Sequence, residues 1–361
     1  MSITTEAVHA ALKQIIDPNT RKDYLSTRSA RNIRIDGADV SLDIELGYPA
    51  RSQIDAIRRC VIDGLRTIPG IGNVSANVAS GIVAHTVQRG LKPLPGVKNI
   101  IAIASGKGGV GKSTTAVNLA LAQEGATVGL LDADIYGPSQ PQMLGLAGRR
   151  PESSDGVSMD PLLAHGLQAM SIGFMIDIDS PMVWRGPMVT QALEQLLKQT
   201  NWQDVDYLLV DMPPGTGDTQ LTLSQKVPVT GAVIVTTPQD IALIDARKGL
   251  KMFEKVGIPI LGLVENMSIH ICSQCGHEEH IFGHGGGEQM CRDYDTEFLG
   301  ALPLELSIRE LTDAGTPTVV GAPDSRAASI YRTIARRLAV KVAERARDMS
   351  ARFPNIVVQN T

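Results

Sequence analysis

The sequence predicts an α/β fold with a doubly wound, mostly parallel sheet, preceded by a small α+β domain. From Ile100 onward, short apolar strand candidates alternate with helical segments, which is typical of a parallel sheet covered on both faces. A glycine-rich stretch joins the first of these strands to the first helix. A linker over 91–98, punctuated by Pro93, Pro95 and Gly96, precedes this pattern. We therefore expect a small domain over 1–90 and a larger domain over 99–361.

The composition is that of a globular protein and argues against several classes of function. The 361 residues suit two domains, and apolar and charged residues make up 43% and 20% of the chain. A net charge of −4 and an aromatic content of 4% do not favour nucleic-acid binding. No apolar run reaches transmembrane length, and the first residues lack the features of a signal peptide. We expect a cytoplasmic protein without nucleic-acid or membrane partners.

The elements of the small domain follow from hydrophobic periodicity. The pattern predicts a helix over 8–16, strands over 33–35 and 40–46, a helix over 52–65 and a strand over 74–78. Asp36 and Gly37 would form the turn between the first two strands. Cys60 lies beside the apolar stripe of the second helix, so we expect it to be a buried structural thiol.

The larger domain contains further strands and helices after the glycine-rich stretch. We predict strands over 127–131, 207–210, 232–236, 260–265 and 298–301, and helices over 115–122, 187–198, 241–256 and 325–349. The last helix carries many cations and an apolar stripe, for which we expect packing on the sheet. A membrane-surface role is the alternative for this helix, although the tail beyond Phe353 is neither basic nor helical in pattern.

The most informative stretch is 100–115, which reads IIAIASGKGGVGKSTT. Gly106 opens a G-x-x-x-x-G-K-S motif that closes on Gly111, Lys112 and Ser113, between a strand and a helix. Glycines there let backbone N–H groups reach phosphate oxygens, Lys112 would contact the β- and γ-phosphates, and the Ser113 hydroxyl would bind Mg²⁺. The motif predicts a P-loop NTPase that binds a nucleoside triphosphate. The expected nucleotide-binding residues are Gly106, Lys107, Gly108, Gly109, Val110, Gly111, Lys112, Ser113 and Thr114.

A second lysine in the loop indicates a particular class of P-loop protein. The stretch SGKGGVGKSTTAVNLA, with Lys107 after the first glycine, resembles the deviant Walker A loop of dimeric ATPases such as MinD, ParA and the nitrogenase iron protein. The resemblance implies ATP hydrolysis and a homodimer, in which the signature lysine reaches the phosphates bound by the facing subunit. Lys107 and Lys112 are therefore candidate catalytic residues.

Polar residues at the ends of three strand candidates complete the expected ATP site. Asp132 and Asp134 lie in the segment DADIYGPS, which resembles switch I of this class. The resemblance implies that Asp134 polarises the attacking water and that Asp132 supports Mg²⁺ through the second shell, although both could instead cap helices. Asp211 ends YLLVD, a Walker B pattern whose carboxylate would hold the Mg²⁺ shell. Asn266 matches the strand-end asparagine that binds adenine in the family.

A second chemistry is predicted by Cys272 and Cys275, which form a C-x-x-C followed by glycine, a spacing that suits two thiolate ligands of one metal centre. With the P-loop and switches, NMS, IFGHGGG and ALPLELSIRELTDAGTP resemble the Mrp/ApbC family of iron–sulfur carrier ATPases over 98–345. That resemblance implies that Cys272 and Cys275 of two subunits hold one bridging 4Fe–4S cluster for transfer to apoproteins. The small domain resembles a domain of iron–sulfur assembly factors. Relatives commonly carry a cysteine beside the proline that starts the second helix, whereas this chain has Tyr48, Pro49 and Ala50 there, so we assign no cluster to this domain.

Other readings of the cysteine segment stay open at this stage. Cys272, Cys275, Cys291 and one histidine from His277, His280 and His284 would suit a tetrahedral zinc site within one chain. The C-x-x-C could also form a redox disulfide. For the whole chain, the alternatives are a MinD- or ParA-like positioning ATPase and a zinc-stabilised regulatory nucleotide-binding module.

Overall fold

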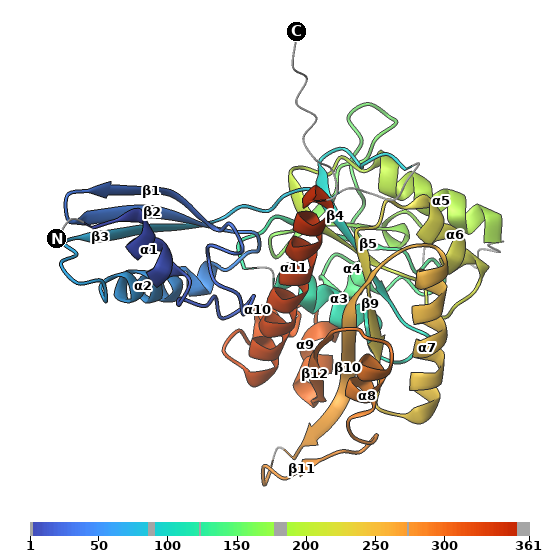
Figure 1. The fold of residues 1–361 in the computed structure, drawn as a ribbon. Coiled ribbons are helices and arrows are strands. Elements are labelled where there is room, and N and C mark those ends of the chain that lie inside the picture. The colour runs from blue at the N-terminus through green and yellow to red at the C-terminus, as the bar shows by residue number, and fades with distance from the viewer. Residues whose placement is uncertain (1–2, 86–90, 123, 177–185, 273, 352–361) are drawn as a thin grey trace. The chain divides into compact units, whose positions relative to one another are not determined.

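The structure is a computed structural model that describes residues 3–85, 91–122, 124–176, 186–272 and 274–351 (Figure 1). The chain divides into two compact units. The N-terminal unit comprises Met1–Val83 together with Ala339–Glu344, and the large unit comprises Ala84–Leu338 together with Arg345–Thr361. Lys22 and Glu344 form an ion pair of 2.8 Å within the N-terminal unit.

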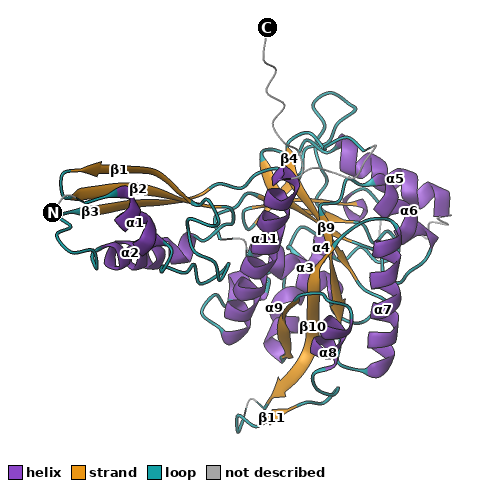
Figure 2. Ribbon diagram, viewed as in Figure 1, coloured by secondary structure: helices purple, strands orange, loops and turns teal. Residues whose placement is uncertain are grey.

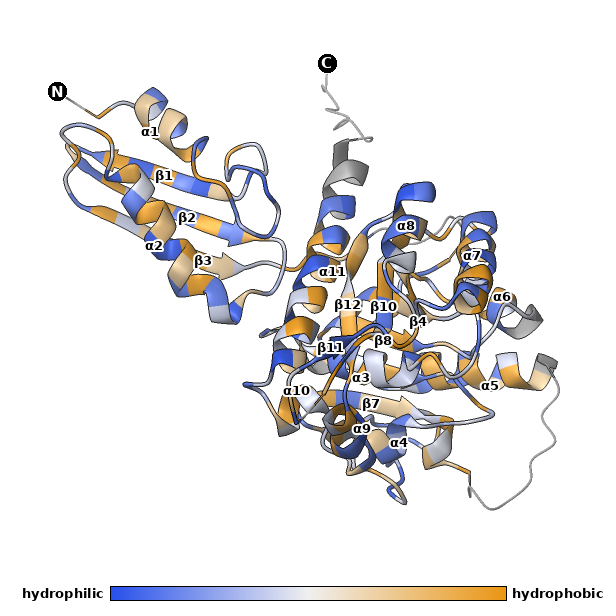
Figure 3. Cartoon of the chain, turned by 90° about the horizontal axis from the view of Figure 1, so that it is seen from below, coloured by the Kyte–Doolittle hydropathy of each residue, from blue (hydrophilic) through white to orange (hydrophobic). Residues whose placement is uncertain are grey.

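The N-terminal unit contains a three-stranded sheet with two helices packed on it (Figure 2). Its elements are α1 (Thr5–Leu12), β1 (Ala30–Asp36), β2 (Asp39–Leu46), the 3₁₀ helix η1 (Arg51–Gln53), α2 (Ile54–Leu65) and β3 (Val74–Ser80). β2 is central, antiparallel to β1 and parallel to β3. Apolar and polar residues alternate along β2 (Figure 3), and its alternate residues Val40, Leu42, Ile44 and Leu46 are buried.

Two details of this unit differ from the prediction. Helix α1 begins and ends earlier than 8–16, because the Thr4 side chain accepts the Ala7 N–H as an N-cap and the helix stops at Leu12. Cys60 is exposed, so the expectation of a buried thiol is wrong. The buried face of α2 carries Ile57, Val61 and Leu65. Cys60 precedes Val61, and one residue turns a helix by about 100°, which places the thiol off this face.

The large unit is built on a nine-stranded sheet of order β11-β10-β9-β4-β8-β5-β7-β6, with β12 paired to β10. Among the strands that the structure describes, only β6 and β11 pair antiparallel with their neighbours, so the predicted mostly parallel sheet is confirmed. Its strands are β4 (Val97–Ala104), β5 (Val128–Asp132), β6 (Leu162–Ala164), β7 (Leu167–Ser171), β8 (Val205–Asp211), β9 (Gly231–Thr236), β10 (Ile260–Ile271), β11 (Glu278–Glu279) and β12 (Phe298–Leu304). All residues of β5 and β9 are buried, as expected of strands covered on both faces.

Helices cover both faces of this sheet, with α5, α6 and α7 along one face and α3 and α9 on the other (Figure 2). The helices are α3 (Lys112–Leu121), α4 (Gln140–Met143), η2 (Ile172–Phe174), α5 (Gly186–Gln199), α6 (Asp218–Lys226), α7 (Asp240–Lys255), α8 (Gly286–Asp293), α9 (Leu306–Asp313), α10 (Thr318–Gly321) and α11 (Arg326–Ala351). The apolar stripe of α11 is buried at Ile334, Leu338 and Val342, which confirms its packing role. The tail beyond Phe353 lies outside the described residues.

Strand β10 is longer than predicted. Its pairing with β9 ends at Glu265, but pairing with β12 continues to His270 after an irregularity, and β11 folds back on its last two residues. Met267 lies in this irregularity with a left-handed φ of 56°. Asn266 therefore does not end the strand, as the sequence suggested, but lies in its middle. Among the described residues, no helix has both the length and the apolar character needed to cross a membrane.

Candidate functional site

The P-loop connects β4 to α3 at the carboxyl edge of the parallel sheet, where ligands of such sheets bind. Gly111 has a left-handed φ of 79°, and a Cβ there would lie 2.2 Å from the Asn266 side chain. The Gly106 backbone packs against α7, because a Cβ at that position would lie 2.1 Å from the Asp245 carbonyl carbon. The motif therefore requires glycine at both positions for conformation and close packing.

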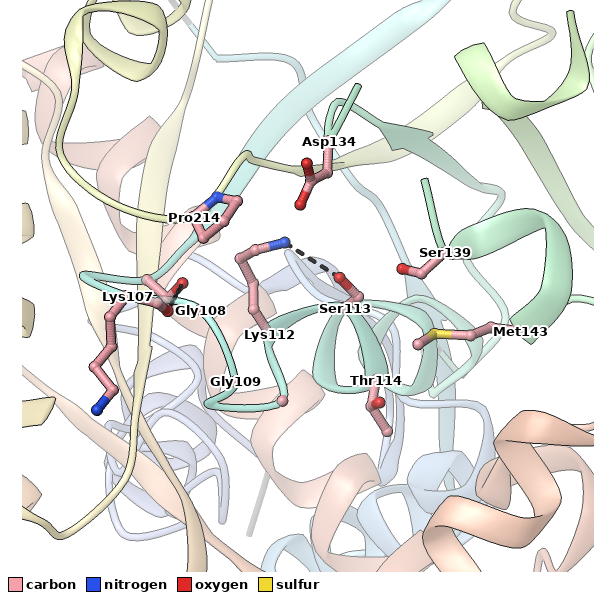
Figure 4. A pocket seen from close by; sticks show the side chains of 12 residues that line it. Lys107, Gly108, Gly109, Lys112, Ser113, Thr114, Asp134, Ser139, Met143 and Pro214 are labelled. Atoms are coloured by element: carbon pink, nitrogen blue, oxygen red, sulfur yellow. Dashed lines mark hydrogen bonds between the residues drawn. The ribbon is translucent and has the colours of Figure 1, made fainter. Parts of the chain in front are cut away.

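A cavity of about 230 Å³ lies over the P-loop (Figure 4). The P-loop contributes Ser105, Lys107, Gly108, Gly109, Gly111, Lys112, Ser113 and Thr114, and Asp134, Ser139, Met143 and Pro214 close it. The Lys107 side chain points away from Lys112 and Ser113 (Figure 4). The Ser105 hydroxyl donates to the Lys107 carbonyl oxygen at 2.9 Å and so restrains the backbone there.

At the base of the cavity, Lys112 forms an ion pair with Asp211, and its Nζ lies 3.2 Å from the Ser113 hydroxyl oxygen. The Lys112 side chain is 6% exposed and that of Asp211 is fully buried. The pair forms because β8 ends beside β4, opposite the start of α3. Lys112 is thus neutralised by the Walker B carboxylate in this structure.

Asp132 lies next to Asp211, because β5 and β8 pair in parallel with these two residues in register. Its carboxylate accepts N–H groups of Asp134 and Gln140, both at 3.1 Å, and the Ser171 hydroxyl at 3.2 Å. Burial, reinforced by the Asp211 carboxylate, raises the pKa of Asp132 to about 7. Burial likewise raises the pKa of Asp134, which is half-buried and faces the cavity opposite Lys112 (Figure 4).

The structure thus brings Lys112, Ser113 and Asp134 to one cavity, while Asp211 and Asp132 are fully buried beside each other, with Asp211 paired to Lys112. It also adds residues that sequence reasoning missed, namely Gln140, Ser139, Met143, Pro214 and Ser171. The segment DADIYGPS includes Ser139 and ends directly before Gln140, and the other three residues lie outside it. Their contacts depend on the chain path after β5.

Asn266 is buried against the P-loop. Its side-chain Nδ2 donates to the Val110 carbonyl oxygen at 2.9 Å. Asn266 also lines a second cavity of about 200 Å³, which shares Gly111 and Thr114 with the first and extends to Pro303 and Tyr331. Asn266 therefore lies between the P-loop and this second cavity.

Cys272 and Cys275 lie in a tight turn between β10 and β11, at the end of the strand that carries Asn266 (Figure 1). The Gly276 N–H donates to the Cys272 carbonyl oxygen and the Cys272 N–H to the His277 carbonyl oxygen, both at 2.9 Å. Backbone N–H groups of Cys275 and Gln274 point at the Cys272 sulfur and lower the pKa of that thiol. The turn therefore favours a thiolate, the form that binds metals.

Cys291 does not join this turn. It is buried in α8, where burial raises the pKa of its thiol to about 12. Within the described part of the chain, no group of three or more His, Cys, Asp and Glu side chains is placed to hold a metal ion. Cys60, Cys272, Cys275 and Cys291 are all free thiols. One chain presents two thiols at this turn, half of what a four-cysteine cluster needs.

Two family models match this chain, one over the large unit and one over the N-terminal unit. A family model described as NUBPL iron-transfer P-loop NTPase matches residues 96–339, and one described as iron-sulfur cluster assembly protein matches residues 5–78. The chain is 52% identical over 327 residues to the iron-sulfur cluster carrier protein of Escherichia coli (strain K12), with 90% of this chain and 88% of the relative covered.

A relative from Mus musculus and one solved structure are also similar to this chain. The iron-sulfur cluster transfer protein NUBPL of Mus musculus is 54% identical over 256 residues, with 69% of this chain and 80% of the relative covered. The solved structure of a nucleotide-binding protein from Archaeoglobus fulgidus in complex with ADP has a TM-score of 0.54 and 37% identity, covering 61% of this chain and 87% of that one.

Proposed function

Since this chain belongs to the family of NUBPL-type iron-transfer P-loop NTPases, we propose that it is an ATP-dependent carrier of iron–sulfur clusters. The observation that carries the proposal is the course of β10. This strand contacts the P-loop through Asn266 and ends at Ile271, directly before Cys272 and a turn that favours a thiolate. One strand thus connects the expected nucleotide site to the turn that carries the two thiols. A MinD- or ParA-like positioning role has less support, because it gives the two thiols no task.

The cavity over the P-loop suits ATP with Mg²⁺. A serine hydroxyl and carboxylates are the hard oxygen ligands that Mg²⁺ prefers, and Ser113 and Asp211 would hold it with Asp132 behind them. The bound ion would neutralise charge on the phosphates. Lys112 would leave Asp211 and contact the β- and γ-phosphates, while Asn266 would bind the adenine. Asp134, at the cavity wall opposite Lys112, would orient the attacking water for hydrolysis.

The cluster is the cargo, and it requires two copies of the chain. A 4Fe–4S cluster takes four cysteine ligands, and Cys272 and Cys275 supply two from each copy. Lys107, directed away from its own cavity, would contact the phosphates of the partner copy. The homodimer would thus be held at both the ATP sites and the cluster. The recipients are apoproteins that need the cluster, and four free thiols suit a reducing compartment such as the cytoplasm.

Anaerobic reconstitution with iron and sulfide tests this function. The wild-type chain should gain about four irons per two chains and a broad visible absorption band. The double variant Cys272→Ala, Cys275→Ala should gain neither. Cys60→Ala, which removes an exposed thiol outside the turn, should load as the wild type does. Stoichiometric zinc in each chain with no cluster, or iron that survives the double substitution, would refute the proposal.

A further inference from the structure

Gln140 is a buried polar residue of the large unit that neither the motifs nor the proposed function uses. It opens the short helix α4, immediately after the segment that contains Asp134, and only 1% of it is exposed. A carboxamide buried this completely needs hydrogen-bond partners. Its partners are all parts of the expected Mg²⁺ site.

The carboxamide Nε2 donates to Asp211 Oδ2 at 2.9 Å and to the Ser113 carbonyl oxygen at 3.1 Å. The backbone N–H of the same residue donates to Asp132 Oδ2 at 3.1 Å. Both partners of Nε2 are acceptors only, so a reversed amide would set Oε1 against two oxygens. The chemistry of the site therefore fixes the orientation of the carboxamide.

The other Asp211 oxygen, Oδ1, is the one that contacts Lys112. Gln140 and Lys112 thus divide the two oxygens of the carboxylate between them. In addition, Gln140 Oε1 and the Ser139 hydroxyl oxygen are buried without a hydrogen-bond partner among the described residues. Ser139 lines the cavity over the P-loop. Both oxygens are acceptors that the water shell of a bound metal ion would satisfy.

We propose that Gln140 is a positioning residue of the Mg²⁺ site, an inference that rests on the proposed nucleotide function. When Lys112 turns to the phosphates, Asp211 Oδ1 is released toward the metal ion and its waters. Gln140 keeps hold of Oδ2 and prevents the carboxylate from rotating. It also ties the carboxylate to Ser113 and to the start of α4, so that the Mg²⁺ site and the segment after β5 move as one.

The test measures the affinity for a fluorescent ADP with EDTA and again with Mg²⁺, in wild type, Gln140→Met and Gln142→Met. Methionine matches glutamine in length and removes the donor. Gln142 lies on the same helix, but its side chain is exposed and donates to the Asp313 carbonyl oxygen. The ratio of the two affinities reports how strongly Mg²⁺ tightens binding, and it does not depend on turnover.

For Gln140→Met we expect an ADP affinity in EDTA within about twofold of wild type. The ratio of the affinity with Mg²⁺ to the affinity in EDTA should be about tenfold smaller than in wild type, as the loss of a hydrogen bond to a charged group implies. Gln142→Met should match wild type in both. If Gln140→Met does not fold, Gln140→Asn, which keeps the carboxamide but shortens its reach, should show the same selective loss.

Two results would overturn the inference while leaving the proposed function intact. Unchanged tightening by Mg²⁺ would show that Gln140 does not position Asp211. Equal weakening with and without Mg²⁺ would show that it supports only the P-loop. A wild-type chain that binds no ADP would instead overturn the proposed function, and this inference with it.

Discussion

Lys112 and Asp211 depend on each other at the scale of single residues, because each is a buried charge whose counter-ion is the other. Removing one partner of a buried pair leaves an uncompensated charge, which costs about 3 kcal/mol or more. Exposed pairs, in contrast, contribute little. The nucleotide-free protein therefore uses the P-loop lysine as a structural cation.

Lys112→Met should accordingly lower the free energy of unfolding of the nucleotide-free protein by about 3 kcal/mol, as measured by urea denaturation. The matched control is Lys248→Met, which breaks the ion pair with Asp245 where the lysine is 63% exposed. That variant should lie within about 0.5 kcal/mol of wild type. Equal effects of the two substitutions would contradict the structural role of Lys112.

Asp132 makes the stability of the nucleotide-free protein depend on pH. Its pKa is raised to about 7, so the folded state holds the proton more tightly than the unfolded chain, where the pKa is 3.8. Its contribution to the free energy of unfolding therefore falls as pH rises from about 4 to about 7, and is constant above.

The expected consequence is that Asp132→Asn, which keeps acceptor oxygen for the N–H groups, flattens this part of the stability–pH curve. Asp155 provides the control, because hydrogen bonds from Ser158 and Val157 lower its pKa to about 2. A lowered pKa adds stability that is lost only as pH falls below about 4. Asp155→Asn should leave the slope between pH 4 and 7 unchanged. If the free energy of unfolding of wild type and of Asp132→Asn changed in parallel between pH 4 and 7, Asp132 would not be the source of the pH dependence.

At the scale of elements, β10 reaches from the P-loop to the Cys272–Cys275 turn because it continues past the edge where its neighbour β9 stops. The Cys272–Cys275 turn at its end depends on Gly276, whose φ of 71° lies in the left-handed region. A side chain there costs about 1 kcal/mol and would distort the N–H groups that point at the Cys272 sulfur.

Gly276→Ala should therefore raise the pKa of the Cys272 thiol toward its usual value. The pH dependence of alkylation at Cys272, followed by mass spectrometry of its peptide, measures this change. Gly257, at the end of α7, is a close control, because it has the same φ of 71° and a Cβ there would meet no atom within 4 Å, as at Gly276. Gly257→Ala should cost similar stability without altering Cys272. If both variants leave the alkylation profile unchanged, the backbone of the turn does not activate this thiol.

The elements also show which signals in the sequence were sufficient. Near-continuous apolar runs predicted β4, β5, β8, β9 and β12, and periodicity predicted α5, α7 and α11 within a few residues. Strand β7 was missed because LQAMS lacks β-branched residues and includes a buried glutamine. The outer part of β10, residues 266–271, was missed because Asn266, Ser268 and His270 interrupt the apolar run, and its pairing with β11 and β12 is not encoded locally.

Some residues of the candidate site could be predicted from the sequence, and others could not. The P-loop and the three aspartates follow strands that the pattern predicts, and parallel strands bring their carboxyl ends together. The contact of Gln140 with Asp211, separated by 71 positions, requires the path of the chain after β5, which no local pattern describes. Exposure of Cys60 likewise depended on which face of α2 meets the sheet.

At the scale of the whole molecule, the proposed dimer is the property that links ATP to the cluster. Lys107 is expected to act between copies, and Lys112 within one copy. The Lys107→Ala monomer should bind a nonhydrolysable ATP analogue with an affinity within about threefold of wild type. The reason is that Lys107 lies at the cavity wall but its side chain points away from Lys112 and Ser113.

Light scattering during size exclusion would measure the consequence for assembly. With the analogue, the wild-type chain should elute as a dimer and Lys107→Ala as a monomer, whereas Lys248→Ala should behave as wild type. If Lys107→Ala weakened binding of the analogue to the monomer as strongly as Lys112→Ala does, Lys107 would contact the nucleotide of its own chain. The proposed role across subunits would then be wrong.

The division of the chain into units also has a consequence for its synthesis. The N-terminal unit includes residues 339–344, with Lys22 paired to Glu344. A ribosome releases these residues only after it has made the large unit as far as Leu338. The N-terminal unit, although translated first, therefore reaches its full set of contacts last, so that folding of the first part of the chain is completed only when the ATP-binding part has already emerged.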